Sequence, residues 1–261
     1  MKPLISIITP VFNSEKTVES CIQSIKKQNN PNIEHIIIDG LSSDNTVATI
    51  KQYDGSYNML WKSEKDTGIA DAMNKGFKLA TGQFVAWIDA DNYYDDRVYE
   101  HIFNKIKSKP EIDIICGLVD VIDGNVIKTF KPDFPFNYKK SLLKNTGGIP
   151  VQPGVFFKKE LFDKVGGFNT KYKVAGDYDF WVKVLKTNPN IDYSNIVFGY
   201  YKKEDLGASQ SAKGIIKGLK EMLTIGKEHN QTFYGKILLI KKYIIGLLSI
   251  YKKKITKTYV K

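Results

Sequence analysis

Cysteine and arginine are both scarce in this chain of 261 residues, and each scarcity argues against a class of protein. The two cysteines, Cys21 and Cys116, lie in apolar stretches, so we expect separate reduced thiols of a cytosolic protein and no disulfide-stapled domain. Arg97 is the single arginine among 39 basic residues, whereas proteins that read nucleic-acid bases usually rely on arginine for bidentate contacts. The composition therefore predicts no nucleic-acid partner.

Long apolar runs are also missing. Met1 and Lys2 lead directly into the first predicted strand without the apolar region of a secretory signal. The longest uncharged stretch near the C-terminus, Tyr243–Tyr251, is far shorter than the roughly 20 apolar residues of a transmembrane helix. No G-x-G-x-x-G motif follows the first predicted strand, which argues against a dinucleotide-dependent dehydrogenase. The chain has three histidines, His35, His101 and His229. Their spacing fits neither a catalytic triad nor a metal site.

The charge is unevenly distributed. Residues 1–201 are nearly neutral, whereas residues 202–261 hold 14 lysines and four acidic residues, a net charge of +10. The pI of 9.3 therefore describes the end of the chain and not its body. The same segment has apolar residues at alternating spacings of four and three, the pattern of one helix face. These residues are Phe233, Ile237, Ile240, Ile244, Leu247 and Tyr251.

Two interpretations of this basic helix remain open. It could lie in the headgroup layer of a membrane, with its lysines toward anionic lipid and its isoleucines and leucines inward. It could instead pack on the body of the protein and leave its lysines in water. A charge of +10 in 60 residues exceeds what solubility requires, which favours peripheral contact with a membrane surface.

Strands and helices are predicted to alternate through the first 110 residues. Apolar runs predict strands over residues 4–8, 34–38, 59–63 and 83–88. The predicted helices include one capped by Asn13 or Ser14 and one that runs from Ile69 to a stop at Gly82. The alternation is typical of an α/β fold with a mostly parallel sheet and helices on both faces. Later segments predict a strand over 112–121, a hairpin turn at Asp123-Gly124 and a helix over 178–187.

Acidic residues follow the fourth predicted strand. Asp89 and Asp91 are two apart on an extended segment, so both carboxylates can face one site. Hard oxygen ligands at the carboxyl end of a parallel strand suit a Mg²⁺ or Mn²⁺ ion that holds a diphosphate. The alternative is that Asp91, with Asp95 and Asp96, only caps the next helix.

Other segments offer polar groups that are weaker evidence when each is taken alone. Asp39 follows the second predicted strand, where it could bind a ligand or simply form a turn. The first strand ends in Thr9-Pro10-Val11-Phe12-Asn13, a loop that could wrap a planar base. Asp177 and Asp179 open a late helix, where residues two apart point in different directions. At most one of them therefore faces the site as a general base, and the other caps the helix or stays exposed.

Taken together, these segments resemble glycosyltransferase family 2. The resemblance covers about residues 4–187 and rests on ISIITPVFN, IIIDGLSSDNT, SEKDTGIADAMNKGFKLATGQFVAWIDADN, VQPGVFFKKELFDKVGGFN and AGDYDFWVKV, in that order. It implies the GT-A nucleotide-diphospho-sugar transferase fold, with a Rossmann-like sheet and an inverting mechanism. We expect a catalytic domain over residues 1–205, with a nucleotide-binding half (1–110) and an acceptor-side half (111–205). Residues 206–261 would form the helical tail.

The resemblance also implies roles for individual residues. Asp91 would be the more direct ligand of the Mn²⁺ or Mg²⁺ ion, assisted by Asp89. Asp177 would be the catalytic base, with Asp179 as its rival because Gly176 replaces the glutamate of the family's Glu-Asp pair. Gln152 would lie on the acceptor side, where Val151 replaces a histidine. The donor nucleotide would be held by Thr9, Pro10, Phe12, Asn13, Asp39, Asp66, Asn74 and Asp89, with Asp39 on the base.

The activity implied by the resemblance is transfer of a sugar from a nucleotide-sugar donor, typically a UDP-sugar. The acceptor would be a hydroxyl of a glycan or of a polyprenyl-linked intermediate in bacterial surface polysaccharide synthesis, of the lipopolysaccharide O-antigen or capsule type. The protein would then work in the cytoplasm, on the inner face of the cytoplasmic membrane. The alternative, suggested by Gly176 and the basic tail, is a catalytically silent, membrane-associated nucleotide-sugar binder.

Overall fold

The structure is a computed structural model that describes residues 4–132, 134–144, 148–202 and 211–259. Its strands are β1 (Ile5–Val11), β2 (Ile33–Asp39), β3 (Met59–Ser63), β4 (Phe84–Trp87), β5 (Tyr93–Tyr94), β6 (Ile114–Asp123), β7 (Val126–Phe130), β8 (Val155–Lys158) and β9 (Ile191–Lys202). Its helices are α1 (Val18–Lys26), α2 (Thr46–Lys51), α3 (Ile69–Leu79), α4 (Val98–Ser108), α5 (Tyr138–Lys144), α6 (Lys159–Val165), α7 (Gly176–Lys186), α8 (Ala212–Glu228) and α9 (Phe233–Tyr259).

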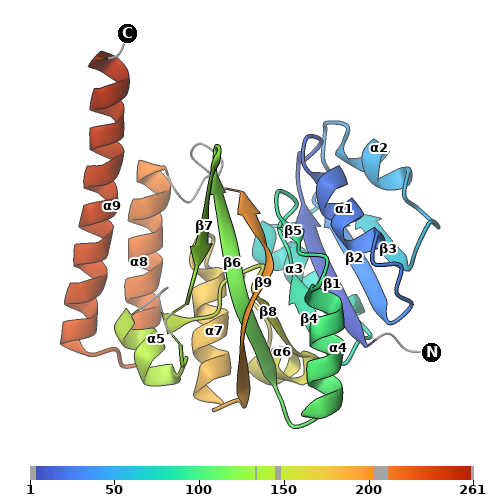
Figure 1. Cartoon of the computed structure of the whole chain (residues 1–261). Coiled ribbons are helices and arrows are strands. Elements are labelled where there is room, and N and C mark those ends of the chain that lie inside the picture. Colours follow the sequence, from blue (N-terminus) through green and yellow to red (C-terminus); the bar gives the residue numbers. More distant parts are fainter. Residues whose placement is uncertain (1–3, 133, 145–147, 203–210, 260–261) are drawn as a thin grey trace.

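The first half of the sheet is parallel, in the order β3-β2-β1-β4 (Figure 1). All four predicted strands are confirmed, and β1 continues beyond the apolar run through Pro10 to Val11. Nearly every residue of β1, β2 and β4 is buried, as expected of central strands covered on both faces. The carboxyl ends of these strands therefore meet at one edge of the sheet.

The second half of the sheet is mixed. β8 lies between β4 and β6 and runs antiparallel to both, whereas β9 is parallel to β6. The prediction of a mostly parallel sheet therefore holds for β1 to β4 and not beyond them. β6 and β7 form the predicted hairpin, and its register pairs Asp123 with Val126. The turn is thus Gly124-Asn125, one residue later than predicted, with Gly124 at a φ of +60°.

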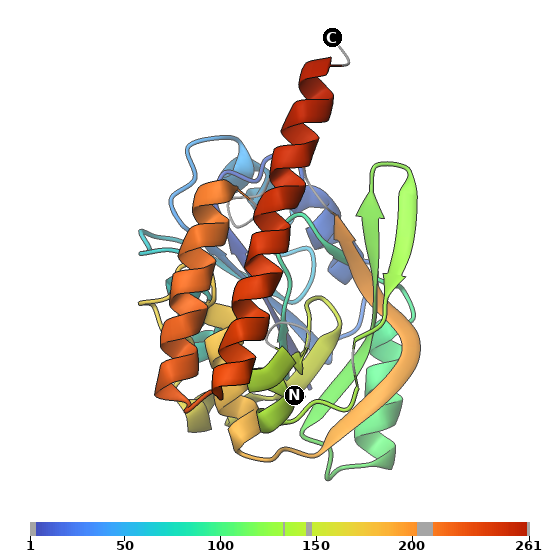
Figure 2. The ribbon, with the colours of Figure 1, turned by 90° about the vertical axis from the view of Figure 1, so that its left-hand side faces the viewer.

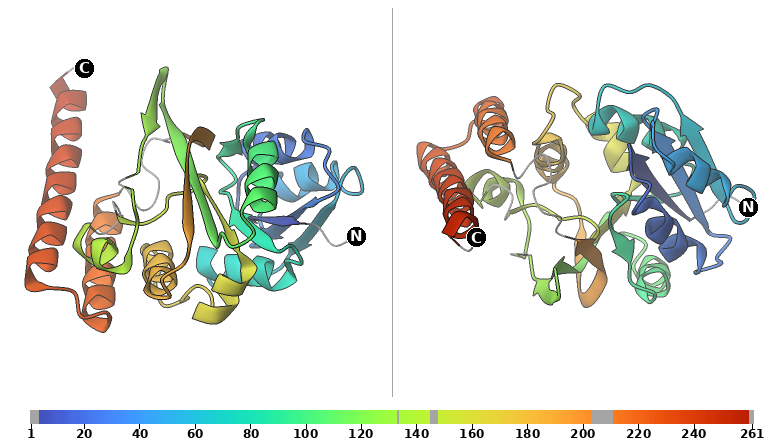
Figure 3. Two further views of the ribbon diagram at one scale, coloured as in Figure 1. Left: turned by 60° about the horizontal axis from the view of Figure 1, so that its bottom comes forward. Right: turned by 90° about the horizontal axis from the view of Figure 1, so that it is seen from above.

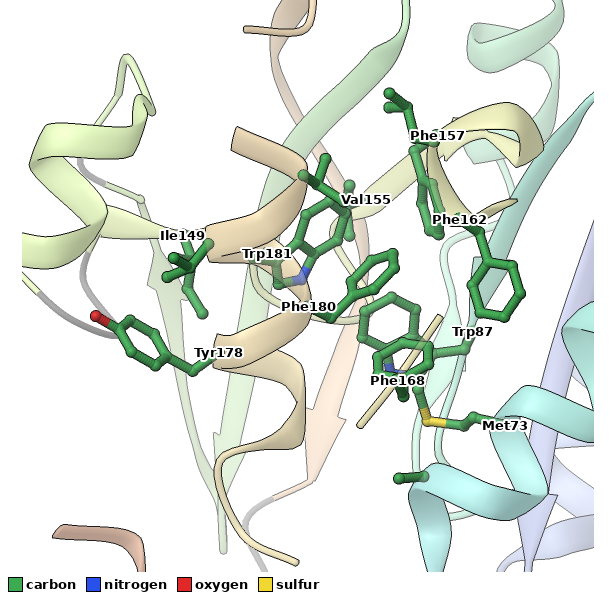
Figure 4. Close-up of a cluster of buried hydrophobic side chains, with 14 of the residues drawn as sticks. Met73, Trp87, Ile149, Val155, Phe157, Phe162, Phe168, Tyr178, Phe180 and Trp181 are labelled. Atoms are coloured by element: carbon green, nitrogen blue, oxygen red, sulfur yellow. The ribbon is translucent and has the colours of Figure 1, made fainter. Parts of the chain in front are cut away.

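Helices cover both faces of the sheet. On one face, α3, α6 and α7 enclose a core rich in aromatic rings, which Figure 4 shows around Trp87, Phe168 and Trp181. Phe168 stacks on Phe180 with ring centroids 4.4 Å apart. On the other face, α1 and α4 bury the alternate residues of the same strands. Cys21 belongs to this second core and Cys116 to the first, so the prediction of two separate buried thiols is confirmed.

Two predicted helix ends are wrong. The first helix begins at Val18 with Thr17 as its N-cap, so neither Asn13 nor Ser14 caps it; a turn in which Ser14 O accepts the N–H groups of Thr17 and Val18 precedes the helix. The helix that begins at Ile69 ends at Leu79, and Gly82 lies beyond it. A Cβ atom at Gly82 would come within 2.6 Å of Ser6 Oγ, so this glycine permits a close approach to β1.

The C-terminal segment forms two antiparallel helices at the end of the molecule opposite β3 (Figures 2 and 3). α8 buries Met222 and Ile225 in the same core as α7, and α9 buries Leu239 there. α9 leaves a row of apolar side chains exposed, among them Phe233, Ile237, Ile240, Ile244 and Leu248. The predicted boundary at residue 205 lies outside the described residues. Among the helices that the structure describes, none is long and apolar enough to cross a membrane.

Candidate active site

Two adjoining cavities open at the carboxyl ends of β1, β2 and β4. The first cavity, of about 1020 Å³, is lined by the loops after β1 and β2, the start of α3 and the segment after β4. The second cavity, of about 620 Å³, lies between α3, the loop before α7 and the start of α8. Ile69 and Asp89 line both cavities. Two ligands placed in these cavities would therefore meet at Asp89.

The first cavity has an apolar rim. Phe12 is 62% exposed and Leu41 is 53% exposed, although both are large apolar side chains. Leu41 also has a φ of +64°, which is uncommon for a branched residue and turns the loop after β2 toward the cavity. Two apolar side chains held at a cavity mouth are suited to enclose a planar ring. Pro10 and Asn13 line the same cavity, as predicted.

Asn13 also joins the two loops of this rim. Its Oδ1 accepts the backbone N–H of Ser43 at 2.9 Å, and its own N–H donates to Ser42 Oγ at 2.8 Å. These hydrogen bonds hold the loop after β1 against the loop after β2. Asn13 thus lines the first cavity while its side-chain oxygen is engaged within the protein.

Thr9 lies elsewhere than predicted. Its side chain is fully buried beneath the cavity, where Oγ1 is 2.8 Å from His35 Nε2. The other ring nitrogen of His35 is 2.6 Å from the hydroxyl of Tyr57, and burial lowers the pKa of His35 to about 3. The side chains of a strand alternate between its faces, and Thr9 belongs to the face that packs under α1. Thr9 therefore supports the site and does not line it.

Asp39 is also buried rather than exposed to the first cavity. Its carboxylate accepts the backbone N–H of Ser42 at 3.1 Å and the hydroxyl of Ser63 at 2.6 Å, and it accepts the Ser42 hydroxyl as well. These bonds fix the loop that carries Gly40 and Leu41. In the structure Asp39 shapes the rim of the first cavity, and the predicted contact with a base would require those bonds to rearrange.

Asp66 and Asn74 are both predicted to hold the nucleotide, but only Asp66 lines the first cavity. Asp66 lines the first cavity, and its Oδ1 accepts the backbone N–H of Gly68 at 2.8 Å. A Cβ atom at Gly40 would lie 2.5 Å from Asp66 Oδ2, so a larger residue at this position would displace the carboxylate. Asn74 instead exchanges two hydrogen bonds with the backbone of Phe168, at 2.8 and 2.9 Å. Asn74 lines neither cavity and joins α3 to the loop before α7.

Asp89 and Asp91 lie together on the first cavity, as the sequence predicts. Asp89 Oδ1 is a buried oxygen without a hydrogen-bond partner in the part of the chain that the structure describes. Burial, followed by repulsion from Asp91 and Asp177, raises the pKa of Asp89 to about 7. Among the residues that the structure describes, Asp89 has no cationic partner, and a divalent cation would supply one.

The residues fit such a cation only in part. Among the described residues, no group of three or more histidine, cysteine, aspartate or glutamate side chains could hold a metal ion. Mg²⁺ is commonly bound by one or two carboxylates, with substrate phosphates and water as its remaining ligands. Asp89 and Asp91 match this arrangement, in which the protein alone makes an incomplete site that a diphosphate would complete.

Of the two candidates for a catalytic base, only one faces a cavity. Asp177 lies in the first turn of α7 and lines the second cavity together with Asp89. Its side chain is exposed to that cavity, and desolvation by the surrounding protein raises its pKa above the ordinary value. Asp179 is fully buried and forms an ion pair with Lys183 at 2.6 Å. A Cβ atom at Gly176 would have no neighbour within 4 Å, so the missing glutamate leaves open space.

Gln152 lines neither cavity. Both polar atoms of its side-chain amide are buried without a hydrogen-bond partner in the described structure. The structure thus does not bring Gln152 into the group of predicted site residues.

Several residues of the two cavities escaped the sequence analysis. Leu41 shows no signal in the sequence, because its role depends on a positive φ. The wall of the second cavity formed by α8 lies beyond every motif of the family resemblance, in a segment that the sequence predicts only as a helical tail. The residues of α8 and its cap that line the second cavity are Ser211, Lys213, Gly214 and Lys217.

Known proteins resemble this chain in sequence. A relative from Rickettsia felis, an uncharacterized glycosyltransferase, is 29% identical over 77% of this chain and 35% of its own length. The chain thus spans about a third of that relative. A PGL/p-HBAD biosynthesis glycosyltransferase from Mycobacterium bovis is 27% identical over 77% of each protein.

Solved structures share the fold. Residues 1–349 of TarS from S. aureus, crystallised with UDP-GlcNAc, superpose with a TM-score of 0.67 at 20% identity, over 86% of this chain and 66% of that TarS chain. The mannosyltransferase PcManGT of Pyrobaculum calidifontis, in complex with GDP-Man and Mn²⁺, gives a TM-score of 0.64 at 16% identity, over 97% of this chain and 76% of the other. The expected GT-A fold is therefore confirmed. The model of glycosyl transferase family 2 matches residues 6–166, and the chain belongs to that family.

Proposed function

We propose that this protein is an inverting, metal-dependent glycosyltransferase that moves a sugar from a nucleotide-diphosphate donor to an acceptor hydroxyl. The observation that carries the proposal is the pair of adjoining cavities that share Asp89, with Asp91 in the first and Asp177 in the second. The first cavity would hold the donor nucleotide and the second the acceptor. Residues 1–205 would provide the catalytic domain, with the donor half over 1–110 and the acceptor half over 111–205.

The first cavity suits a nucleoside diphosphate. Phe12 and Leu41 would enclose the base, and Pro10 and Asp66 would contact the rest of the nucleoside. Asp89 and Asp91 would hold Mg²⁺ or Mn²⁺, which when bound offsets the charge on the leaving diphosphate. Since the pKa of Asp89 is about 7 without a cation, its carboxylate would be fully charged only above neutral pH or beside a positive ion.

Asp177 would act as the general base. It would accept the proton of the acceptor hydroxyl while that oxygen attacks the anomeric carbon from the face opposite the leaving diphosphate, which inverts the configuration. The raised pKa of Asp177 brings it closer to neutral pH and so makes it a better proton acceptor. Asp179 is unsuited to this role because Lys183 neutralises it in the core.

The substrate classes are part of the proposal. UDP-sugars are favoured as donors because TarS was crystallised with UDP-GlcNAc. A glycan or polyprenyl-linked acceptor of bacterial surface polysaccharide synthesis fits a protein that works on the inner face of the cytoplasmic membrane. Gln152, with its unsatisfied buried amide, remains a candidate for support of the acceptor side.

Peripheral contact with that membrane would be made by α9. Its exposed row includes Ile237, Ile240, Ile244 and Leu248, and the segment from residue 202 onward has a net charge of +10. Apolar side chains that enter the headgroup layer, with lysines near anionic lipid, are the usual features of a helix that lies on a membrane.

The proposal is tested by thermal unfolding with UDP, GDP, dTDP and CDP, each with and without Mn²⁺. A ligand at about 100 times its dissociation constant adds roughly 2.7 kcal/mol to the free energy of unfolding. We expect a Mn²⁺-dependent rise in Tm with one nucleotide, lost in Asp91→Ala and retained in Asp177→Asn. Asp177→Asn should then abolish sugar transfer, whereas Asp179→Asn should not.

Two outcomes would contradict the proposal. Absence of any Tm shift with every nucleotide would remove the donor site. A nucleotide shift without sugar transfer from any matching donor would favour the catalytically silent binder instead.

A further inference from the structure

The segment before α7 is held by a carboxylate of α8. Glu221 Oε1 accepts the backbone N–H of Lys173 at 3.0 Å, and Glu221 Oε2 accepts those of Val174 and Ala175, both at 2.9 Å. A single side chain thus satisfies three successive backbone donors. Hydrogen bonds to a charged acceptor are stronger than neutral ones, so this contact is an effective clamp on the segment.

The clamp lies next to the proposed base. Ala175 is the N-cap of α7, and Asp177 is the second residue of that helix. The position of Asp177 in the second cavity therefore depends on where residues 173–175 place the first turn of α7. No other side chain in the described structure accepts a hydrogen bond from these three backbone N–H groups.

We propose that Glu221 is a positioning residue for the catalytic base, an inference that rests on the proposed role of Asp177. With this role of Glu221, α8 contributes to the active site, although α8 lies outside residues 6–166, which match the family model. Glu221 acts on Asp177 only through the backbone of residues 173–175. A displacement of the base by a fraction of an ångström is sufficient to reduce proton transfer and catalysis.

The test compares Glu221→Gln with Glu228→Gln. Glutamine keeps the size of the side chain but has one acceptor oxygen and no charge, so it cannot hold all three N–H groups. Glu228 is a matched control on the same helix, where it accepts the hydroxyl of Tyr172 at 2.9 Å without contact to residues 173–175. Hydrogen exchange of the amides of residues 173–175 reports the clamp without requiring any activity.

We expect Glu221→Gln to speed exchange of these amides, to lower kcat about tenfold or more and to leave the KM for the donor nearly unchanged. The pH profile of kcat should also shift, because it reports the ionisation of the base. Glu228→Gln should stay within about twofold of the wild type. The inference is overturned if the amides of Glu221→Gln exchange faster while kcat and its pH profile do not change, or if exchange is unaltered. Failure of the proposed function would appear separately, as full activity in Asp177→Asn.

A second, independent observation concerns the charge of the second cavity. Lys213 and Lys217, one turn apart on α8, line it and form no ion pair with any described residue. The third lysine of the cavity, Lys173, donates instead to the carbonyl of Thr67 at 2.6 Å. The rest of the lining includes the apolar side chains of Met73, Trp87 and Phe168. The cavity also holds the carboxylates of Asp89 and Asp177, so the lysines and the acidic residues share it.

We infer that the acceptor taken by the second cavity carries an anionic group of the phosphate class, which Lys213 and Lys217 bind. A lysine pair beside an apolar surface suits a ligand with one charged and one apolar part. The donor diphosphate is the other possible source of phosphate at this point. The first cavity has its own lysines, Lys16 and Lys65, so the acceptor is the source we favour.

The test measures binding of glycerol 3-phosphate and of glycerol to the protein. The protein is first saturated with UDP and Mn²⁺, so that the donor site is already filled. Calorimetry should show binding of glycerol 3-phosphate and not of glycerol, with the affinity reduced about fivefold or more in Lys213→Gln/Lys217→Gln. Lys220→Gln, on the same helix but outside the cavity, is the control. Equal affinities in both variants, or no binding of glycerol 3-phosphate to the wild type, would overturn the inference. A loss of UDP affinity in the double variant would also overturn it, because the lysines would then serve the donor.

Discussion

At the scale of single residues, the raised pKa of Asp89 predicts how stability changes with pH. The folded protein holds the Asp89 proton up to about pH 7, whereas the unfolded chain releases it near the ordinary value of 3.8. Between these values the native state binds more protons than the unfolded state, so the free energy of unfolding falls as the pH rises. Metal-free protein should therefore lose stability between about pH 4 and pH 7 through this group.

Asp89→Asn provides the control for this prediction. Asparagine has no proton to lose, so the decrease in Tm between pH 4 and pH 7 should be smaller in the variant. Mn²⁺ binding by the wild type, measured with UDP present, should strengthen from pH 6 to pH 8 as the carboxylate ionises. Identical pH dependence of Tm in the two proteins would contradict the raised pKa.

Asn74 gives a second prediction at this scale. Its two hydrogen bonds to Phe168 are partly buried, so Asn74→Ala should lower the free energy of unfolding by about 1–3 kcal/mol. Denaturant unfolding measures the loss, and Lys78→Ala on the same helix should change stability by less than about 0.5 kcal/mol. The UDP affinity of folded Asn74→Ala should equal that of the wild type. A selective loss of UDP affinity would restore the predicted role of Asn74 in nucleotide binding.

The sequence predicts where the acidic residues of the site lie better than it predicts which side chains face the cavities. Asp89, Asp91 and Asp177 were predictable because each follows a strong structural signal, an apolar strand or a helix start. Thr9 and Asp39 belong to the same site, but their side chains are turned inward by strand alternation and by partners in distant loops. Such partners are set by tertiary packing, which no local pattern records.

At the scale of elements, α9 carries a prediction about membranes. Ile240 and Ile244 are 40% and 50% exposed, so replacing both with glutamate should leave the fold intact. Burial of an isoleucine in an apolar environment is worth about 1.5–3 kcal/mol, so the double variant should bind anionic vesicles at least tenfold more weakly. Co-sedimentation with vesicles of 30% phosphatidylglycerol measures this.

Ile127→Glu is the control for α9, because Ile127 on β7 is an apolar residue that is even more exposed, at 60%. It should bind vesicles as the wild type does. If the double variant binds vesicles as strongly as the wild type and Ile127→Glu do, α9 is not a membrane-contacting helix. The same conclusion follows if the wild type does not bind vesicles at all.

The predictability of the elements follows from their length and burial. The strands β1, β2 and β4 are apolar throughout, and α3 repeats its apolar residues with helical spacing, so their existence was clear. The direction of β8 could not be foreseen, because a four-residue apolar strand fits a sheet in either direction. α8 packs on the body through Glu221 and a short apolar face of Leu219, Met222, Leu223 and Ile225, and no motif of the family resemblance marks this segment.

For the whole molecule, the two thiols report global unfolding. Cys21 and Cys116 are buried on opposite faces of the sheet, and burial raises the pKa of Cys21 to about 12 and that of Cys116 further still. Neither should react with a thiol reagent such as DTNB in the native protein at pH 8, because the thiolate is the reactive form. Two equivalents should react in guanidinium chloride. Rapid reaction of one thiol in buffer would reveal local opening of the layer that covers it.

The continuous sheet has a consequence for how the chain is made. β4 ends at Trp87, but its partner strand β8 begins only at Val155. Tyr93 in β5 likewise pairs with Tyr200, which is synthesised more than a hundred residues later. During synthesis the nucleotide half therefore leaves the ribosome with the edge of β4 unpaired, a template for association with other nascent chains. Contacts of such long sequence separation also form slowly. The protein should consequently depend on chaperones or on low temperature for a high yield of soluble protein.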